Sequence, residues 1–214
     1  TCGPLGVLPA LTMRIKKHKL DDTEKRSGDL KLSYGGATRV VESTMNLRSY
    51  IRDIPDFPKP GILFKDITPL LQSATAFAHV MDCLVQCYQD RTVDAVLAIE
   101  ARGFFFGAGL ALRLNKPLVP IRKQGKLPYE TRSVTYALEY GSDTVEIHRD
   151  GIEPGQKVII VDDLLATGGT MAAACRLAEE SGAEVEGLAL VIELTELAGR
   201  NRLGSYDILS LVKY

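Results

Sequence analysis

Hydrophobic positions from about residue 75 onward alternate between two periods, one typical of strands and one typical of helices. Apolar runs of strand length occur at residues 93–99, 117–121, 157–161, 184–194 and 206–212, and helical spacing occurs at 75–89, 103–114 and 169–182. Strands that alternate with helices in this order predict right-handed parallel crossovers. We therefore expect an α/β fold with a central parallel sheet flanked by helices.

One later stretch departs from this crossover pattern. Residues 133–140 and 143–149 alternate apolar and polar side chains, with Gly141 and Ser142 between them. Two alternating runs around such a turn predict a β-hairpin. We expect this hairpin to stand off the main sheet.

The beginning of the chain has a different character. Residues 46–51 predict a short amphipathic helix, and the prolines at 55–60 forbid a long helix directly after it. Residues 1–44 have no sustained periodicity, so we expect a flexible extension. A chain that starts at Thr1 is compatible with processing, and Met45 could equally be the natural start.

Composition narrows the function classes. With 214 residues, 45% of them hydrophobic, the chain can bury one substantial core, which we assign to residues 45–214. The net charge is -1, whereas a nucleic-acid binder is expected to carry a net positive charge, so we expect no nucleic-acid partner. The four cysteines contain no CxxC pair and predict reduced thiols in the cytoplasm. No apolar stretch is long enough for a membrane helix, so we expect no membrane association.

Candidate chemistry follows the strand predicted at 157–161. Asp162 and Asp163 come at its carboxyl end, where open parallel sheets bind their ligands. A bare acidic pair is also typical of an Asx turn. Residues 166–170, ATGGT, then open the next helix, where unpaired N–H groups and the helix dipole favour an anion, although an ordinary helix cap has the same composition. Together the two features fit a ribose 5-phosphate.

The complete run VIIVDDLLATGGT at 158–170 resembles the signature of the type I phosphoribosyltransferases, in the form found in members that use adenine. The resemblance extends from about Asn46 to Tyr214 and implies the type I phosphoribosyltransferase-like fold, with a small N-terminal hood at 46–72 and a flexible catalytic loop and hairpin at 122–147. It implies ribose contacts from Asp162 and Asp163. It also implies 5-phosphate contacts from Ala166, Thr167, Gly168, Gly169 and Thr170.

The same resemblance assigns a pyrophosphate loop to Ala101, Arg102 and Gly103, after the strand predicted at 93–99. Taken without it, Arg102 would be a surface cation and Gly103 a turn residue. An arginine fork suits a pyrophosphate. We expect a strained or cis peptide here, because backbone strain often marks ligand clamps.

A cationic loop follows at 122–131, with Arg122, Lys123 and Lys126 close together. Such loops are often only solvated, but the resemblance implies that these three residues bind pyrophosphate. It also implies that Glu139, in the sequence LEYG, donates or relays a proton at N7 of the purine. The implied catalytic residues are therefore Glu139, Arg102 and Lys126.

The segment IPDFPKPGILFKDITPLL at 54–71 resembles the adenine-binding hood of the family. Its prolines fix an irregular backbone, which leaves main-chain groups free to contact a base edge. The resemblance implies that Leu63, Phe64 and Lys65 bind adenine, with Ile67 packed nearby. Without it, the segment would be a hydrophobic strap over the core.

The implied activity is a pentosyl transfer in purine salvage, in which adenine and phosphoribosyl pyrophosphate give AMP and pyrophosphate. The resemblance also implies Mg²⁺, held mainly through the substrate, and a homodimer. Two alternatives stay open. One is a phosphoribosyltransferase for hypoxanthine or guanine, and the other is a non-enzymatic regulator that binds phosphoribosyl pyrophosphate or a nucleotide.

Overall fold

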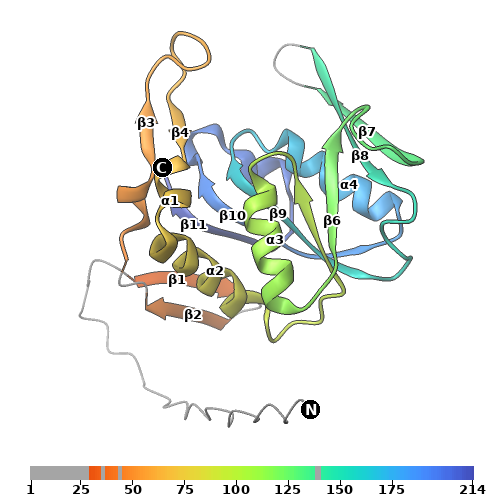
Figure 1. Ribbon diagram of the computed structural model, residues 1–214, viewed down its shortest axis with the longest axis horizontal. Coiled ribbons are helices and arrows are strands. Elements are labelled where there is room, and N and C mark those ends of the chain that lie inside the picture. The colour runs from red at the N-terminus through yellow and green to blue at the C-terminus, as the bar shows by residue number, and fades with distance from the viewer. Residues whose placement is uncertain (1–28, 35–36, 43–44, 138–140) are drawn as a thin grey trace, which may run out of the picture.

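The computed structural model describes residues 29–34, 37–42, 45–137 and 141–214 (Figure 1). The predictions for residues 1–28 and for Glu139 lie outside these ranges. The centre of the fold is a sheet of seven strands in the order β11-β10-β9-β5-β6-β8-β7. These strands are β5 (Ala95–Ile99), β6 (Leu118–Lys123), β7 (Thr131–Ala137), β8 (Ser142–His148), β9 (Lys157–Leu165), β10 (Glu184–Glu193) and β11 (Ile208–Lys213).

The five strands from β11 to β6 pair in parallel, which confirms the predicted parallel sheet. Helix α3 (Gly103–Leu114) connects β5 to β6, and α4 (Gly169–Glu180) connects β9 to β10. The range of α3 is the predicted one. Strand β9, by contrast, continues four residues beyond the predicted end at Val161, because Asp162, Leu164 and Leu165 still pair with β10.

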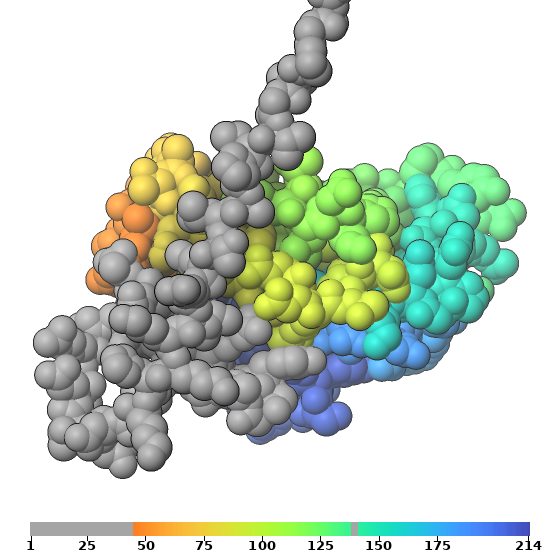
Figure 2. All heavy atoms as spheres, turned by 90° about the horizontal axis from the view of Figure 1, so that it is seen from below, coloured from red at the N-terminus to blue at the C-terminus, as the bar shows by residue number. Residues whose placement is uncertain are grey.

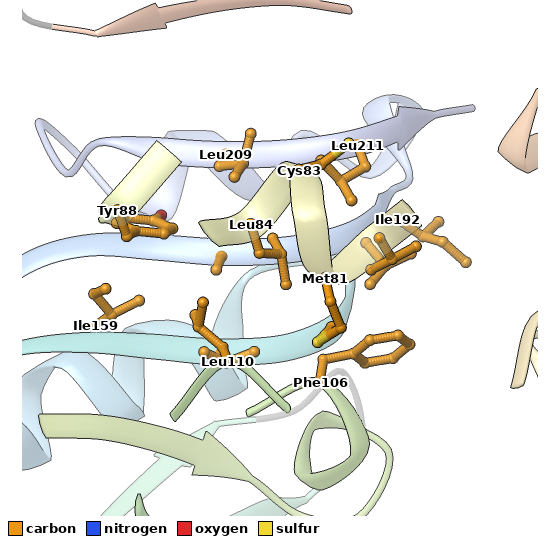
Figure 3. Close-up of a cluster of buried hydrophobic side chains, with 14 of the residues drawn as sticks. Met81, Cys83, Leu84, Tyr88, Phe106, Leu110, Ile159, Ile192, Leu209 and Leu211 are labelled. Carbon is orange, nitrogen blue, oxygen red and sulfur yellow. The ribbon is translucent and has the colours of Figure 1, made fainter. Parts of the chain in front are cut away.

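Helices cover both faces of the sheet, which explains why its central strands are apolar at consecutive positions. Figure 3 shows the cluster on one face, where Met81 and Leu84 of α2 (Ala74–Tyr88) and Phe106 of α3 pack toward Ile159 of β9. On the other face Ile160 belongs to a second cluster with side chains of α4. Successive residues of β9 thus point to opposite cores, as strand geometry requires.

The hairpin of β7 and β8 was predicted correctly, but its predicted position was wrong. It does not stand off the main sheet, because β8 pairs antiparallel with the last two residues of β6. Arg122 lies opposite Glu146, and Lys123 lies opposite Val145. The cationic loop therefore starts from a strand that is tied to the hairpin.

The predicted hood contains a two-stranded antiparallel sheet of β3 (Arg52–Ile54) and β4 (Phe64–Asp66), followed by the short helix α1 (Thr68–Gln72). The expected helix before it is the single 3-10 turn η1 (Leu47–Tyr50), capped by the Asn46 side chain. Strands β1 (Asp29–Tyr34) and β2 (Ala37–Glu42) also pair antiparallel, which the lack of periodicity did not predict.

In Figure 1 the β3–β4 hairpin and the β7–β8 hairpin rise on the same side of the molecule, at opposite ends of the sheet. The view from below also separates the orange and yellow hood from the green and cyan hairpin (Figure 2). Among the described residues, no helix combines the length and the apolarity that a membrane crossing requires.

Candidate functional site

A cavity of about 410 Å³ lies at the carboxyl ends of β5 and β9. Glu100, Ala101 and Arg102 line it from the connection between β5 and α3, and Lys123 lines it from the end of β6. The rest of the lining is the continuous segment 162–171. The structure therefore brings the predicted ribose and 5-phosphate residues into one cavity with three of the predicted pyrophosphate residues, Ala101, Arg102 and Lys123. The other three, Gly103, Arg122 and Lys126, are not part of its lining.

The two acids on β9 are in different surroundings although they are adjacent. The Asp162 Oδ1 atom accepts a hydrogen bond of 2.8 Å from the Asp163 amide. The Asp163 side chain is 6% exposed, and its Oδ2 atom lies 2.9 Å from Arg102 Nη2. That ion pair is poorly aligned, because Asp163 Oδ2 accepts no hydrogen bond from the described residues.

Burial raises the pKa of Asp162 well above its ordinary value, and the neighbouring Asp163 charge raises it further. Burial also raises the pKa of Asp163, although the Arg102 guanidinium opposes that shift. Two adjacent carboxylates in a partly closed cavity are costly when both are ionised. Ligand groups that donate hydrogen bonds, such as ribose hydroxyls, would relieve this cost.

The loop that follows β9 lines one part of the cavity. Gly168 caps the amino end of α4 with φ at +81°, a left-handed conformation that favours glycine. A Cβ atom on Gly168 would come within 2.4 Å of the Gly199 carbonyl oxygen, and one on Gly199 would come within 2.2 Å of the Ala166 carbonyl oxygen. The loop is thus held against η3 (Gly199–Arg202), with the first turn of α4 facing the cavity.

The next element of the site is the connection between β5 and α3. It contains a cis peptide between Glu100 and Ala101, at the edge of the predicted segment. A Cβ atom on Gly103 would lie 2.9 Å from both Asp162 Oδ1 and the Val161 carbonyl oxygen. Gly103 therefore allows α3 to begin directly against the acidic end of β9.

Arg102 joins this connection to the hood. Its Nη1 atom donates a hydrogen bond of 3.1 Å to the Lys65 carbonyl oxygen, and its guanidinium carbon lies 4.9 Å from the centre of the Phe64 ring. Leu63 is half exposed, whereas the Lys65 side chain is buried and pairs with Asp53 at 2.6 Å. Phe64 and the main chain of Lys65 thus contact Arg102, although the cavity lining described above includes none of the predicted adenine residues.

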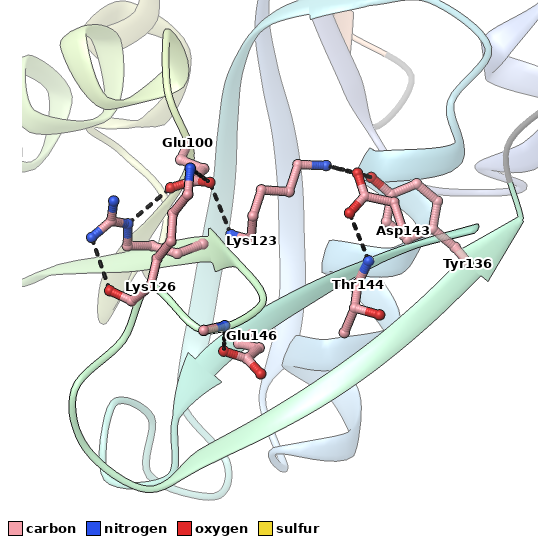
Figure 4. A network of polar contacts seen from close by, with 9 residues as sticks. Glu100, Lys123, Lys126, Tyr136, Asp143, Thr144 and Glu146 are labelled. Carbon is pink, nitrogen blue, oxygen red and sulfur yellow. Dashed lines mark hydrogen bonds and ion pairs between the residues drawn. The ribbon is translucent and has the colours of Figure 1, made fainter. Parts of the chain in front are cut away.

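Two of the predicted pyrophosphate cations, Arg122 and Lys126, pair with Glu100, a residue that the sequence did not single out (Figure 4). Its two carboxylate oxygens accept hydrogen bonds of 2.8 Å from Arg122 Nε and Lys126 Nζ and of 3.0 Å from the Lys123 amide. Burial by itself would raise the pKa of Glu100, but these hydrogen bonds outweigh it and lower the pKa. Arg122 and Lys126 are therefore positioned beside the cavity through Glu100, and Lys123 reaches its lining.

The Lys123 ammonium has two partners on the hairpin. It pairs with Asp143 and donates a hydrogen bond of 2.8 Å to the Tyr136 hydroxyl. Burial would raise the pKa of Asp143, but the hydrogen bonds from Lys123 and the Thr144 amide lower it, so Asp143 stays ionised at neutral pH. Tyr136 and Asp143 are further residues near the site that the strand pattern did not distinguish from their neighbours.

Among the described residues, no group of three or more histidine, cysteine or acidic side chains is arranged to hold a metal ion. Asp162 and Asp163 nevertheless supply carboxylate oxygens, the donors that Mg²⁺ prefers. The donor atoms at this site thus fit a divalent cation.

Comparisons with known proteins agree with this geometry. A family model described as "Phosphoribosyl transferase domain" matches residues 66–211. The adenine phosphoribosyltransferase of Roseiflexus castenholzii is 57% identical over 171 residues, which cover 80% of this chain and 99% of that protein.

Solved structures give the same result. The crystal structure of adenine phosphoribosyltransferase from Thermoanaerobacter pseudethanolicus aligns with a TM-score of 0.77 and 53% identity, over 78% of this chain and 98% of that one. The enzyme from Saccharomyces cerevisiae, complexed with an imino-altritol bisphosphate and adenine, aligns with a TM-score of 0.73 and 40% identity, over 77% and 96% of the two chains.

Proposed function

This chain belongs to the adenine phosphoribosyltransferase family, and on that premise we propose that it transfers the phosphoribosyl group of phosphoribosyl pyrophosphate to N9 of adenine. The C1–N9 bond forms as the bond from C1 to the pyrophosphate oxygen breaks, with inversion at C1. Adenine loses its N9 proton, and the products are AMP and pyrophosphate. The chain is then a pentosyltransferase of purine salvage.

One observation carries this proposal. The acidic pair on β9, the anion-binding turn at 166–170 and Arg102 all line one cavity of about 410 Å³. A phosphoribosyl group presents hydroxyls and a 5-phosphate at a fixed separation. In the proposal Asp162 and Asp163 accept hydrogen bonds from the ribose hydroxyls, and the amides and hydroxyls at the start of α4 bind the 5-phosphate.

The leaving pyrophosphate is assigned to Ala101, Arg102 and Gly103, with further charge from Lys123 and from the cations beside it. Arg122 and Lys126 each pair with the Glu100 carboxylate. The ion pairs with Glu100 hold the two cations beside the cavity. A bound pyrophosphate would compete with Glu100 for Arg122 and Lys126. Preorganised cations of this kind stabilise charge that develops on a leaving group.

Mg²⁺ would neutralise pyrophosphate charge when bound, and the carboxylates of Asp162 and Asp163 would help to hold it. We assign the purine to the hood, where the main chain of Leu63 and Lys65 and the ring of Phe64 would contact it. The proton at N7 is assigned to Glu139, which lies between the described ends of β7 and β8.

A homodimer in the cytoplasm completes the proposal. Phe105 is 50% exposed and Leu112 is 82% exposed, and they lie seven residues apart on one face of α3. A second copy could bury such apolar side chains. Sedimentation over a range of concentrations tests this assignment, and a monomer at every concentration would overturn it.

The proposed cytoplasmic location agrees with the state of two cysteines. Cys83 and Cys175 are buried and form no disulfide, as expected in a reducing compartment.

The activity is tested with one assay. Phosphoribosyl pyrophosphate and Mg²⁺ are supplied with adenine, hypoxanthine or guanine in separate reactions, and nucleotide formation is followed by chromatography. AMP as the only nucleotide formed in the three reactions supports the proposal. Product from an oxopurine would instead favour the related phosphoribosyltransferases, and no product with any base would favour a regulator that binds phosphoribosyl compounds.

A further inference from the structure

One tyrosine hydroxyl connects the anion-binding turn at 166–170 to Lys123 at the end of β6. Tyr136 OH lies 3.0 Å from Thr170 Oγ1, in the first turn of α4. The same oxygen lies 2.8 Å from Lys123 Nζ and 3.3 Å from Asp143 Oδ2. Lys123 and Thr170 both line the cavity, so Tyr136 connects two of its walls from outside the lining.

The hydrogen-bonding capacity of these groups limits how they can be arranged. A phenol has one proton to donate and two lone pairs to accept with, and a lysine ammonium only donates. Lys123 therefore takes one lone pair of Tyr136. The single Tyr136 proton can go to Asp143, which is ionised, or to Thr170, but not to both.

A phosphate at the turn changes the balance between these two acceptors. Phosphate oxygens only accept, so a Thr170 hydroxyl that binds one must donate its own proton to it. The Thr170 oxygen is then left as an acceptor toward Tyr136. We propose that Tyr136 is a positioning residue for the 5-phosphate, because its hydroxyl turns the Thr170 proton toward the phosphate and gives up the longer bond to Asp143.

The position of the ring is consistent with this role. A Cβ atom built on Gly169 would lie 3.5 Å from Tyr136 Cδ2, so the ring packs against the turn itself. The hydroxyl is thereby held at the turn by β7, which is a regular strand paired with β8. The inference rests on the proposed 5-phosphate site, but it concerns a residue that would not touch the substrate.

Ribose 5-phosphate binding, measured by isothermal titration calorimetry, tests the inference without catalysis. We expect Tyr136→Phe to bind ribose 5-phosphate about fivefold more weakly than the wild type, the size expected for one hydrogen bond. Tyr206→Phe is the matched control, because it removes a hydroxyl that contacts Glu179 on the same helix, away from the cavity. Equal affinities for wild type and Tyr136→Phe would overturn the inference.

A double-mutant cycle separates positioning from a general loss of stability. If the Tyr136 hydroxyl acts through Thr170, then Tyr136→Phe has no further effect on ribose 5-phosphate affinity in a Thr170→Val background. Fully additive losses would show that Tyr136 does not act through Thr170. In steady-state assays Tyr136→Phe should raise KM for phosphoribosyl pyrophosphate and leave KM for adenine unchanged, and equal effects on both would contradict the inference.

Asp143→Asn gives a prediction of opposite sign. It removes the charged acceptor that competes for the Tyr136 proton, so ribose 5-phosphate should bind at least as tightly as in the wild type. A loss as large as that of Tyr136→Phe would refute the competition. If wild-type protein did not bind ribose 5-phosphate at all, the proposed function would fail first, and the two failures are thus distinguishable.

Discussion

The buried glutamate after β5 offers the sharpest test of how the cationic strand is positioned. Glu100 is 5% exposed and accepts hydrogen bonds from Arg122, Lys126 and the Lys123 amide. Glu100→Gln keeps the shape of the side chain but leaves one acceptor oxygen in place of two. The new NH₂ group of this buried side chain then faces a hydrogen-bond donor.

These contacts set the expected loss in the free energy of unfolding. One buried donor that loses its acceptor costs roughly 1–3 kcal/mol. The side chains of Arg122 and Lys126 are 36% and 53% exposed, so water replaces much of their lost attraction to Glu100. We expect a net loss of about 2 kcal/mol in the free energy of unfolding. For a chain of this size that corresponds to a fall of roughly 4–8 °C in Tm.

Thermal unfolding followed by circular dichroism measures this change, with Glu180→Gln as the matched control. Glu180 makes a helical i,i+4 pair with Arg176 in which both side chains are about half exposed or more, so its loss should cost under about 0.5 kcal/mol. Equal Tm values for the two variants would refute the role assigned to Glu100.

The pH dependence gives an independent check. Because the pKa of Glu100 is lowered in the folded protein, its ionised form stabilises the fold above the unfolded pKa, and that contribution disappears as the pH falls through the folded pKa. The Tm difference between wild type and Glu100→Gln should therefore be largest near neutrality and shrink in acid. A difference that grows in acid would contradict the lowered pKa.

Four further outcomes are expected from the same geometry. Arg102→Ala should lower turnover by a factor of about 100 or more while the fold survives, and near-normal turnover would remove Arg102 from the mechanism. Gly199→Ala should weaken ribose 5-phosphate binding by roughly tenfold or more, because the new Cβ would displace the Ala166 carbonyl. Wild-type affinity by calorimetry would refute the importance of the close approach between Gly199 and Ala166. Asp162→Asn should raise the free energy of unfolding at pH 7.5 by roughly 1 kcal/mol and should lower turnover. The raised pKa of Asp162 means that its charge destabilises the fold as the pH rises. A Tm that is unchanged or lower would contradict the raised pKa. Chelation of Mg²⁺ should abolish turnover and leave Tm unchanged, whereas a lower Tm would indicate a metal that the fold itself requires.

The sequence predicted the architecture because the periodicity of buried side chains is a local property. The range of α3 and the order of crossovers followed from apolar spacing, since residues buried on both faces of a sheet must be apolar at every position. The end of β9 could not be read in the same way. Polar residues at 162 and 163 interrupt the apolar run, yet the backbone continues to pair with β10, and pairing does not depend on side-chain polarity.

The position of the hairpin shows a second limit. Alternation at 133–140 and 143–149 was sufficient to predict two paired strands, but it contains no information on which edge receives them. The contact of β8 with the last two residues of β6 is made by backbone groups, so no side-chain pattern marks it in advance. Strands β3 and β4 are three residues long and were below the length at which alternation is detectable.

By itself the sequence determined the α/β class and the segments that carry the candidate chemistry, because strand ends, glycines and charged groups are local signals. Tertiary structure decided how these groups pair. Arg102 could meet Asp163 of β9 and the Lys65 carbonyl of β4 only after the hood came to lie beside the carboxyl ends of β5 and β9. Glu100 could pair with Arg122 and Lys126 only after β5 and β6 had paired. A lysine in a loop has the same sequence signature whether it is solvated or held by a buried carboxylate. The distances that distinguish the two cases exist only in the folded chain.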